Sequence, residues 1–173
     1  VSEDGTQAKV YLFDVYGRGH AKFFEEVWVP IADGKIVPEI DNVRLNQISV
    51  VQRYANGDRH IVNGLFKGVH VESGAVATFW PAPKAYFVAV GQDCDEMCNC
   101  LQQLDTHVGG CMVTENKEVK AMLPLEIYGV MANMGLSELI TATRSIDAAL
   151  EALGNHNEGE PVVNKLMTLF ISL

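Results

Sequence analysis

The chain has 173 residues, of which 48% are hydrophobic and 20% are charged, so it can bury a substantial core and is unlike a disordered segment. Its formal net charge is -9, which argues against nucleic acid and anionic lipid as partners, because both are themselves negatively charged. No apolar run approaches the roughly 20 residues that a bilayer requires, so we expect no membrane-spanning segment.

Cysteine usage favours a reducing compartment. Three of the four cysteines crowd between Cys94 and Cys100, and no Asn-x-Ser/Thr sequon occurs, so neither a spread disulfide framework nor a glycosylation site indicates secretion. We therefore predict a cytoplasmic location. The chain starts at Val1 without a methionine, and a leader or anchor removed before that residue stays an open alternative.

The first half of the chain is predicted to form strands. Residues 8–16 are rich in β-branched and aromatic side chains, and the glycine-bearing loop 17–20 that follows favours a hairpin with a return strand over 22–29. Asp33-Gly34 predicts a second, short turn, flanked by prolines that belong at strand edges or ends.

The strongest turn signal is Asn56-Gly57, because a type I′ turn needs positive φ at both central residues and this dipeptide tolerates it. It predicts a hairpin over 45–66 in which Val50 pairs with Asn63 and the tip projects into solvent or toward a partner. Two further strands are predicted, at 69–79 and 85–90.

The second half changes character. Asp93 is the predicted N-cap and Glu96 the N3 residue of a helix over 94–104. One or two strands are expected over 111–128, followed by a helix over 136–153. Ser137 is the predicted N-cap of that second helix, and Gly154 its C′ residue. The apolar stretch 162–173 is predicted to be a final strand.

These elements predict an α+β fold, in which an antiparallel β meander, as a curved sheet or an open barrel, packs against two helices. We expect one domain over residues 1–173, with residues 1–7 as a flexible N-terminal tail. If the meander closes, five aromatic side chains could line its interior as a pocket or simply fill it. They are Phe23, Phe24, Trp28, Phe79 and Trp80.

The cysteines are the one grouping that suggests a metal, either zinc or an iron–sulfur centre. The candidate ligands are Cys94, Cys98, His107 and Cys111. Cys100 would lie about 200° around the helix from Cys98, so one helix cannot direct all three of its thiols at one ion. We favour the alternative that Cys94 and Cys98 are core residues, because a free cysteine behaves as a small buried hydrophobe. A disulfide is a third alternative.

Catalytic signatures are missing from the sequence. The 17–20 loop lacks the strand-to-helix context of a phosphate loop, and no Gly-x-Ser-x-Gly elbow occurs. His70 and Glu72 fall on one face of a predicted strand, where a histidine and its orienting carboxylate could act as a base, although such a pair more often forms the polar side of the sheet.

We therefore predict a non-enzymatic module for protein–protein contact, with itself as a homo-oligomer or with another protein in an assembly. A small-molecule or metal-binding protein is the first alternative. An enzyme whose residues come from separate strands is the second alternative, and its signature would be a pocket that holds His70 or His107 beside a carboxylate, with a shifted pKa.

Overall fold

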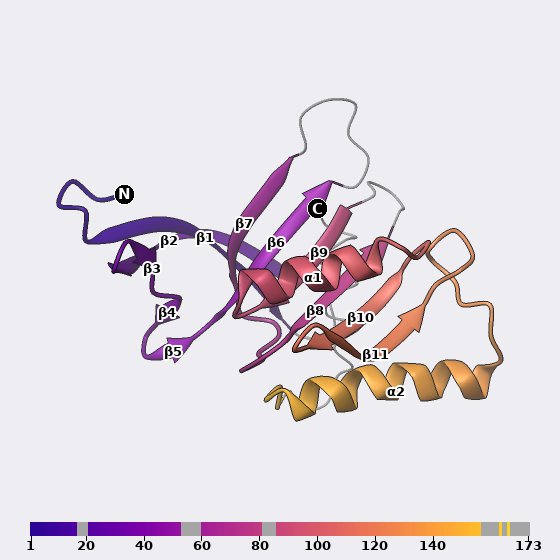
Figure 1. The fold of residues 1–173 in the computed structure, drawn as a ribbon. Coiled ribbons are helices and arrows are strands. Elements are labelled where there is room, and N and C mark those ends of the chain that lie inside the picture. The colour runs from indigo at the N-terminus through magenta and orange to yellow at the C-terminus, as the bar shows by residue number, and fades with distance from the viewer. Residues whose placement is uncertain (17–20, 53–59, 81–85, 157–162, 164–165, 167–173) are drawn as a thin grey trace.

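The computed structural model describes residues 1–16, 21–52, 60–80, 86–156, 163 and 166. The first half consists mainly of strands, and the two helices α1 and α2 lie in the second half (Figure 1). The strands are β1 (Gln7–Tyr16), β2 (Ala21–Ala32), β3 (Lys35–Ile36), β4 (Glu39–Ile40), β5 (Val43–Arg44), β6 (Asn46–Gln52), β7 (Ile61–Phe66), β8 (Ala75–Trp80), β9 (Tyr86–Gly91), β10 (Gly110–Glu115) and β11 (Glu118–Pro124). The helices are α1 (Cys94–Leu104) and α2 (Leu136–Ala152).

Most of the strands form one large sheet, in the order β11-β10-β8-β9-β6-β7-β1-β2-β3. Every pair in it is antiparallel except β1 and β7, which run parallel and join the N-terminal hairpin to the rest. Over the described residues the sheet is open, with β11 at one edge and β3 at the other. The predicted α+β class with two helices is confirmed, while closure into a barrel is not found among these strands.

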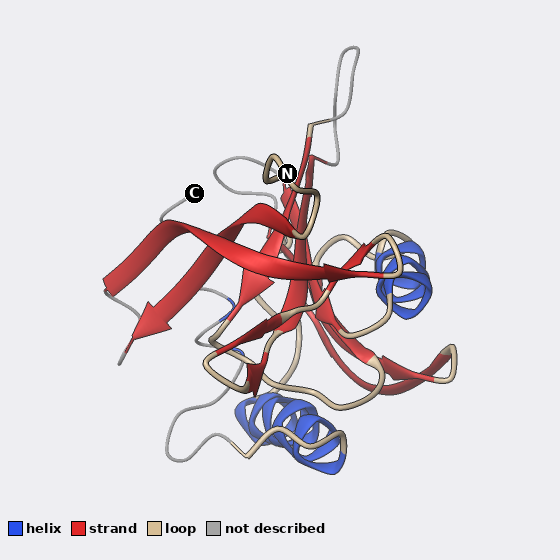
Figure 2. Cartoon of the chain, turned by 90° about the vertical axis from the view of Figure 1, so that its left-hand side faces the viewer, coloured by secondary structure: helices blue, strands red, loops and turns tan. Residues whose placement is uncertain are grey.

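The two helices cover opposite faces of the sheet, as Figure 2 shows. Met97, Cys100 and Leu104 of α1 pack on a face built from small side chains, among them Ala75 and Ala77 of β8. Ile146 and Leu150 of α2 pack on the other face, which carries the valines of the same strands. Because both faces of β8, β9 and β10 are buried, these strands consist mostly of apolar residues, and Thr78 and Thr114 are buried polar exceptions.

Tight turns hold several of the hairpins. Asp33 (φ 50°) and Gly34 (φ 73°) are both left-handed, which confirms the predicted turn between β2 and β3. Asn116 (φ 53°) and Lys117 (φ 64°) form a turn of the same kind between β10 and β11, which the sequence prediction missed.

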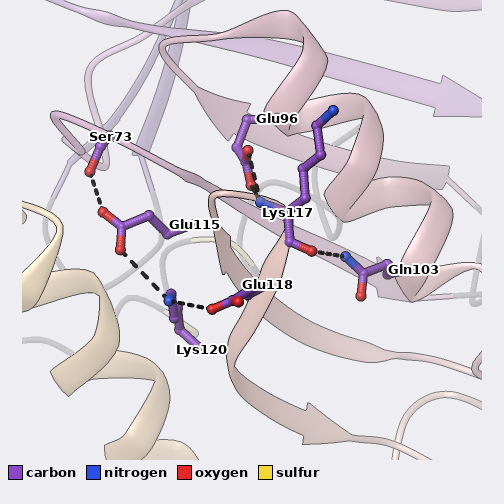
Figure 3. Close-up of polar contacts among 7 residues, drawn as sticks. All are labelled: Ser73, Glu96, Gln103, Glu115, Lys117, Glu118 and Lys120. Carbon is purple, nitrogen blue, oxygen red and sulfur yellow. Dashed lines mark hydrogen bonds and ion pairs between the residues drawn. The ribbon is translucent and has the colours of Figure 1, made fainter.

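Two residues of helix α1 form hydrogen bonds with the turn between β10 and β11 (Figure 3). The backbone N–H of Lys117 donates to both carboxylate oxygens of Glu96, at 3.0 and 3.2 Å, and Gln103 Nε2 donates to the Lys117 carbonyl at 3.1 Å. Glu115 accepts from Ser73 Oγ at 2.9 Å, which ties the same hairpin to the loop before β8. Glu96, the predicted N3 residue of this helix, is buried, and its side chain reaches the neighbouring hairpin.

The predicted register of the 45–66 hairpin is wrong by one residue. Val50 pairs with Val62 rather than with Asn63, and Gln52 N donates to the His60 carbonyl. The register is set by burial, because β6 also pairs with β9 on its other side and must turn Ile48 and Val50 into the core. The Asn56-Gly57 turn itself lies outside the described residues.

Three further element predictions need correction. The strand predicted over 69–79 begins only at Ala75, because residues 67–74 form a loop. The N-cap of α2 is Gly135, two residues earlier than Ser137, and its N–H donates to Glu138 Oε2 at 3.0 Å. In the stretch 162–173, predicted as a strand, the two described residues Val163 and Leu166 are helical and buried.

Residues 1–7 were predicted as a flexible tail. In the structure β1 begins at Gln7, Ile31 N donates to the Thr6 carbonyl and Ser2 N donates to the Gln7 carbonyl, each at 2.8 Å. Gly154, the predicted C′ residue of α2, has the expected left-handed backbone with φ of 96°. In the part of the chain that the structure describes, no helix is long and apolar enough to cross a membrane.

Candidate functional site

A polar cleft lies where β5, the 67–74 loop and the start of α1 meet. One hollow of about 360 Å³ is lined by Arg44, His70, Glu72 and Gln92. An adjoining hollow of about 460 Å³ shares Arg44 and His70 and adds an apolar wall that includes Leu45, Phe66 and Val69. We call the two together the Arg44 cleft. Both volumes fall within the roughly 300–1,000 Å³ that is usual for small-molecule sites.

Buried asparagines hold the loop that carries His70 and Glu72. Asn46 is fully buried on β6, where its Nδ2 donates to the Val71 carbonyl and its Oδ1 accepts from Val71 N, both at 3.0 Å. His70 N donates to Oδ1 of Asn155 at 3.1 Å. Val71 between the two polar residues is itself fully buried, so His70 and Glu72 project from an anchored backbone.

Glu72 sits against the end of helix α2. Its N–H donates to the Leu153 carbonyl at 2.7 Å, and a Cβ placed on Gly154 would lie only 2.7 Å from Glu72 Cγ. A side chain at Gly154 would therefore displace the carboxylate from the cleft, in addition to straining a left-handed backbone.

Hydrogen bonds fix the opposite wall of the cleft. Arg44 Nε donates to Gln92 Oε1 at 3.0 Å, and Gln47 Nε2 donates to the Gln92 carbonyl at 3.1 Å. Cys94 Sγ donates to Gln47 Oε1 at 3.4 Å, which links the first residue of α1 to the same network. The cleft thus combines a guanidinium, an imidazole, a carboxylate and an amide at a polar rim beside an apolar wall.

A second cation borders the apolar hollow. Lys67 Nζ lies 3.5 Å from Oδ2 of Asp14, and the side chain of Asp14 is almost fully buried. Because a buried carboxylate is stable only with a partner, Lys67 is held near the cleft by its charge.

The structure separates the four predicted metal ligands rather than gathering them. Cys94 and Cys98 are exposed on α1, and His107 is exposed in the loop after that helix. Cys111 is buried on β10 in the core beneath α2, on the other side of the sheet from α1. Within the described residues, no group of three or more His, Cys, Asp and Glu could hold a metal ion. The zinc or iron–sulfur hypothesis stays a prediction that only metal analysis can test.

The favoured alternative, that Cys94 and Cys98 are core residues, is wrong. The buried stripe of α1 is Met97, Cys100 and Leu104, so the helix turns Cys100 toward the sheet and leaves the other two thiols outside. Met97, Cys100 and Leu104 follow a three–four spacing, so they share one helix face. The sequence spacing also allowed a face with Cys94 and Cys98, and packing on β8 and β10 selects the face that contains Cys100. All four cysteines are free.

Burial raises the pKa values of the two buried thiols, Cys100 and Cys111. Desolvation raises the pKa of the Cys100 thiol to about 12, and it raises the pKa of Cys111 further. Both therefore remain neutral thiols at physiological pH, which makes them poor nucleophiles and poor metal ligands.

The closed barrel whose interior the five aromatic side chains could line or fill is not found among the described strands. Phe79 is fully buried and stacks on Phe87 with ring centroids 4.5 Å apart, so it is a core residue. Trp28 is half exposed on β2. The side chains of Phe23, Phe24 and Trp80, like the 17–20 loop, lie outside the described residues.

Of the sequence-based candidates, the His70–Glu72 pair is the one that the structure places in a cleft. Sequence inspection could not find Arg44 and Gln92, which join this pair only through tertiary contacts and carry no local motif. A histidine beside a carboxylate in a pocket is the geometric part of the arrangement that we expected of an enzyme.

Comparison with known proteins identifies relatives of this chain. An adenine deaminase of Oceanobacillus iheyensis is 37% identical over 105 residues, which are 61% of this chain and 18% of that protein. Adenine deaminase 2 of Shouchella clausii is 35% identical over 127 residues, or 73% of this chain and 22% of that protein. An adenine deaminase of Desulforamulus reducens is 26% identical over 151 residues, which are 87% of this chain and 25% of that protein. The chain thus spans about a quarter or less of the length of these relatives.

The family described as adenine deaminase C-terminal domain matches residues 24–172. This match overturns the prediction of a non-enzymatic interaction or assembly subunit, because the relatives are enzymes. The prediction failed because the sequence has no familiar catalytic motif, and a missing motif was taken as a sign against catalysis. The chain belongs to the adenine deaminase C-terminal domain family.

Proposed function

We propose that this chain works as a domain of an adenine deaminase and that its Arg44 cleft binds the purine base. The observation that carries the proposal is the family match over residues 24–172, and the cleft is the described feature whose chemistry suits such a ligand. Because the relatives are about four or more times longer than the aligned region, we assign further catalytic groups to polypeptide outside this chain.

The groups in the cleft complement the edge of adenine. Its exocyclic amine is a hydrogen-bond donor and N7 is an acceptor, so a carboxylate suits the amine and an amide or guanidinium suits the ring nitrogen. Glu72 supplies the carboxylate for the amine, while Gln92 and Arg44 supply the amide and the guanidinium for the ring nitrogen. The flat apolar faces of the base suit the wall of Leu45, Phe66 and Val69.

The reaction adds water at C6 of adenine and releases the amine as ammonia, which leaves hypoxanthine. This step needs proton transfer to the departing nitrogen. In our proposal Glu72 and His70 orient the base through its amine. The predicted protein partner becomes, in this proposal, the remainder of the enzyme, and the four free thiols support a cytoplasmic location.

Isothermal titration of the 173-residue chain with adenine tests the proposal. We expect Glu72→Gln to weaken binding by about tenfold or more, since it removes a charged acceptor from the amine. The matched control is Glu118→Gln, because Glu118 is an exposed carboxylate of β11 and is not among the residues that line the cleft. Release of ammonia from adenine, measured with the chain alone and within a longer enzyme, tests the assignment to deamination.

Two results would contradict the proposal. If adenine binds the wild-type chain and the Glu72→Gln variant equally well, the cleft is not the purine site. If neither the chain nor an enzyme that contains it releases ammonia from adenine, the deaminase assignment fails.

A further inference from the structure

Exposed apolar side chains gather where the 105–109 loop meets the 125–135 segment. We call Val108, Ile127, Tyr128 and Met131 the Tyr128 face. Both segments lie at the same end of the molecule, at the right of Figure 1, between the end of α1 and the start of α2. Tyr128 is 82% exposed, and the other three are exposed as well. Tyrosine and methionine are enriched in the cores of protein interfaces, whereas solvated loops rarely present a cluster of this kind.

The backbone beneath the Tyr128 face is fixed. Ile127 N donates to the Met131 carbonyl at 2.9 Å, and Met131 N donates back to the Ile127 carbonyl at 3.2 Å. Leu125 N donates to the Gly109 carbonyl at 3.0 Å. A Cβ on Gly109 would lie 2.5 Å from Gly129 Cα, so the two segments touch backbone to backbone. The four side chains therefore stand on a rigid, preformed platform.

Tyr128 itself has an unfavourable conformation. Its φ is 52°, in the left-handed region that an aromatic residue seldom occupies. A strained residue that is buried can be explained by packing, but the side chain of Tyr128 projects into solvent. The conformation comes from a tight turn instead. Tyr128 and Gly129 (φ 66°) are its central residues, and Val130 N donates to the Ile127 carbonyl at 3.1 Å, so the turn presents Tyr128 at its tip.

We infer that the Tyr128 face docks against the part of an adenine deaminase that precedes this domain. The inference rests on the proposed function. Relatives extend far beyond the aligned region, and the family is described as a C-terminal domain, so most of the enzyme lies on the N-terminal side of it. A domain in such a chain needs a contact surface, and a rigid apolar platform with a central aromatic residue suits a specific interdomain contact.

The test measures binding between the 173-residue chain and the Oceanobacillus iheyensis adenine deaminase expressed without its own C-terminal domain. Cooperative thermal unfolding first shows that the shortened enzyme is folded. We expect a one-to-one complex by isothermal titration and analytical ultracentrifugation. Tyr128→Asn should weaken this complex by about 30-fold or more, the effect expected of an interface hot spot.

Asparagine is chosen at position 128 so that a loss of binding can be distinguished from a loss of folding stability. Asparagine adopts positive φ more readily than tyrosine, so the Tm of the Tyr128→Asn chain should stay the same or rise. Met131→Ser is a second variant of the face and should also weaken the complex. Val119→Ser is the matched control, because Val119 is an exposed apolar residue near the other end of β11 and outside the Tyr128 face. It should change affinity by less than about twofold.

Three outcomes would overturn the inference. The first is a complex whose affinity is unchanged by both face variants, and the second is no complex at all. The third is a wild-type chain that dimerises by itself and that Tyr128→Asn makes monomeric, which would assign the face to a second copy. A complex that depends on Tyr128 but does not deaminate adenine would instead contradict the proposed function and leave the docking face intact.

Discussion

The four thiols of this chain lie in two different environments, which gives a test of the structure at single residues. Cys94 and Cys98 are exposed, while Cys100 and Cys111 are buried. Only the exposed pair should react with a thiol reagent such as DTNB in the native protein, and all four should react in denaturant. Rapid reaction of four thiols in the native state would contradict the placement of Cys100 against β8 and β10.

Burial of Cys100 also predicts a pH dependence of stability. Its folded-state pKa, about 12, is above the ordinary value of 9.0, because burial disfavours the thiolate. Below pH 9 both states keep the proton, and the folded state has its full stability. As pH rises from 9.0 toward about 12 only the unfolded state ionises, so this contribution is lost.

Urea unfolding at increasing alkaline pH measures this effect. The free energy of unfolding should fall more steeply for the wild type than for Cys100→Ala, with Cys98→Ala as the exposed control that leaves the slope unchanged. An equal slope in wild type and Cys100→Ala would mean that the thiol is not buried.

At the scale of elements, Glu96 joins α1 to the β10–β11 hairpin. Replacing it with alanine removes the acceptor for the Lys117 N–H, so Glu96→Ala should lower the free energy of unfolding by about 1–3 kcal/mol. Glu118→Ala, at a carboxylate whose side chain is 76% exposed, should change it by less than about 0.5 kcal/mol. Chemical denaturation of both variants checks this, and equal losses would contradict a specific role for Glu96.

Elements were predicted best where the signal is local. The Asp33-Gly34 turn, the Asp93 N-cap and the Gly154 C′ residue each depend on a few neighbouring positions, and all three are confirmed. The hairpin register failed because it depends on β9, a strand about 40 residues away that pairs with the outer side of β6. A side-chain period of two means that this error of one residue reverses which face is buried.

At the scale of the whole molecule, we propose that residues 1–173 form one cooperative domain. The main core cluster draws on residues from Phe13 to Leu166, so it joins the first strand to described residues that follow α2. Thermal unfolding should therefore be a single transition with equal calorimetric and van't Hoff enthalpies. Two separate transitions would show that the smaller cluster around Leu12, Val29 and Leu65 unfolds on its own.

Sequence inspection could predict only two of the four residues that line the smaller hollow of the candidate site. His70 and Glu72 could be paired because alternate residues of an extended segment share a side. Arg44 and Gln92 could not, since 26 and 20 residues respectively separate them from His70 and Glu72 in the chain. Asn46 is the residue that fixes the site's loop, and its bonds to Val71 follow no local pattern.

The sequence by itself determined the α+β class, most strand and helix positions and the local turns, because periodicity, capping and turn chemistry act over a few residues. Tertiary structure decided the sheet order, the parallel β1–β7 pair, which thiol of α1 faces the core and how the Arg44 cleft is assembled. These features depend on which apolar surfaces can be buried together, and that is a property of the packed chain rather than of any one segment.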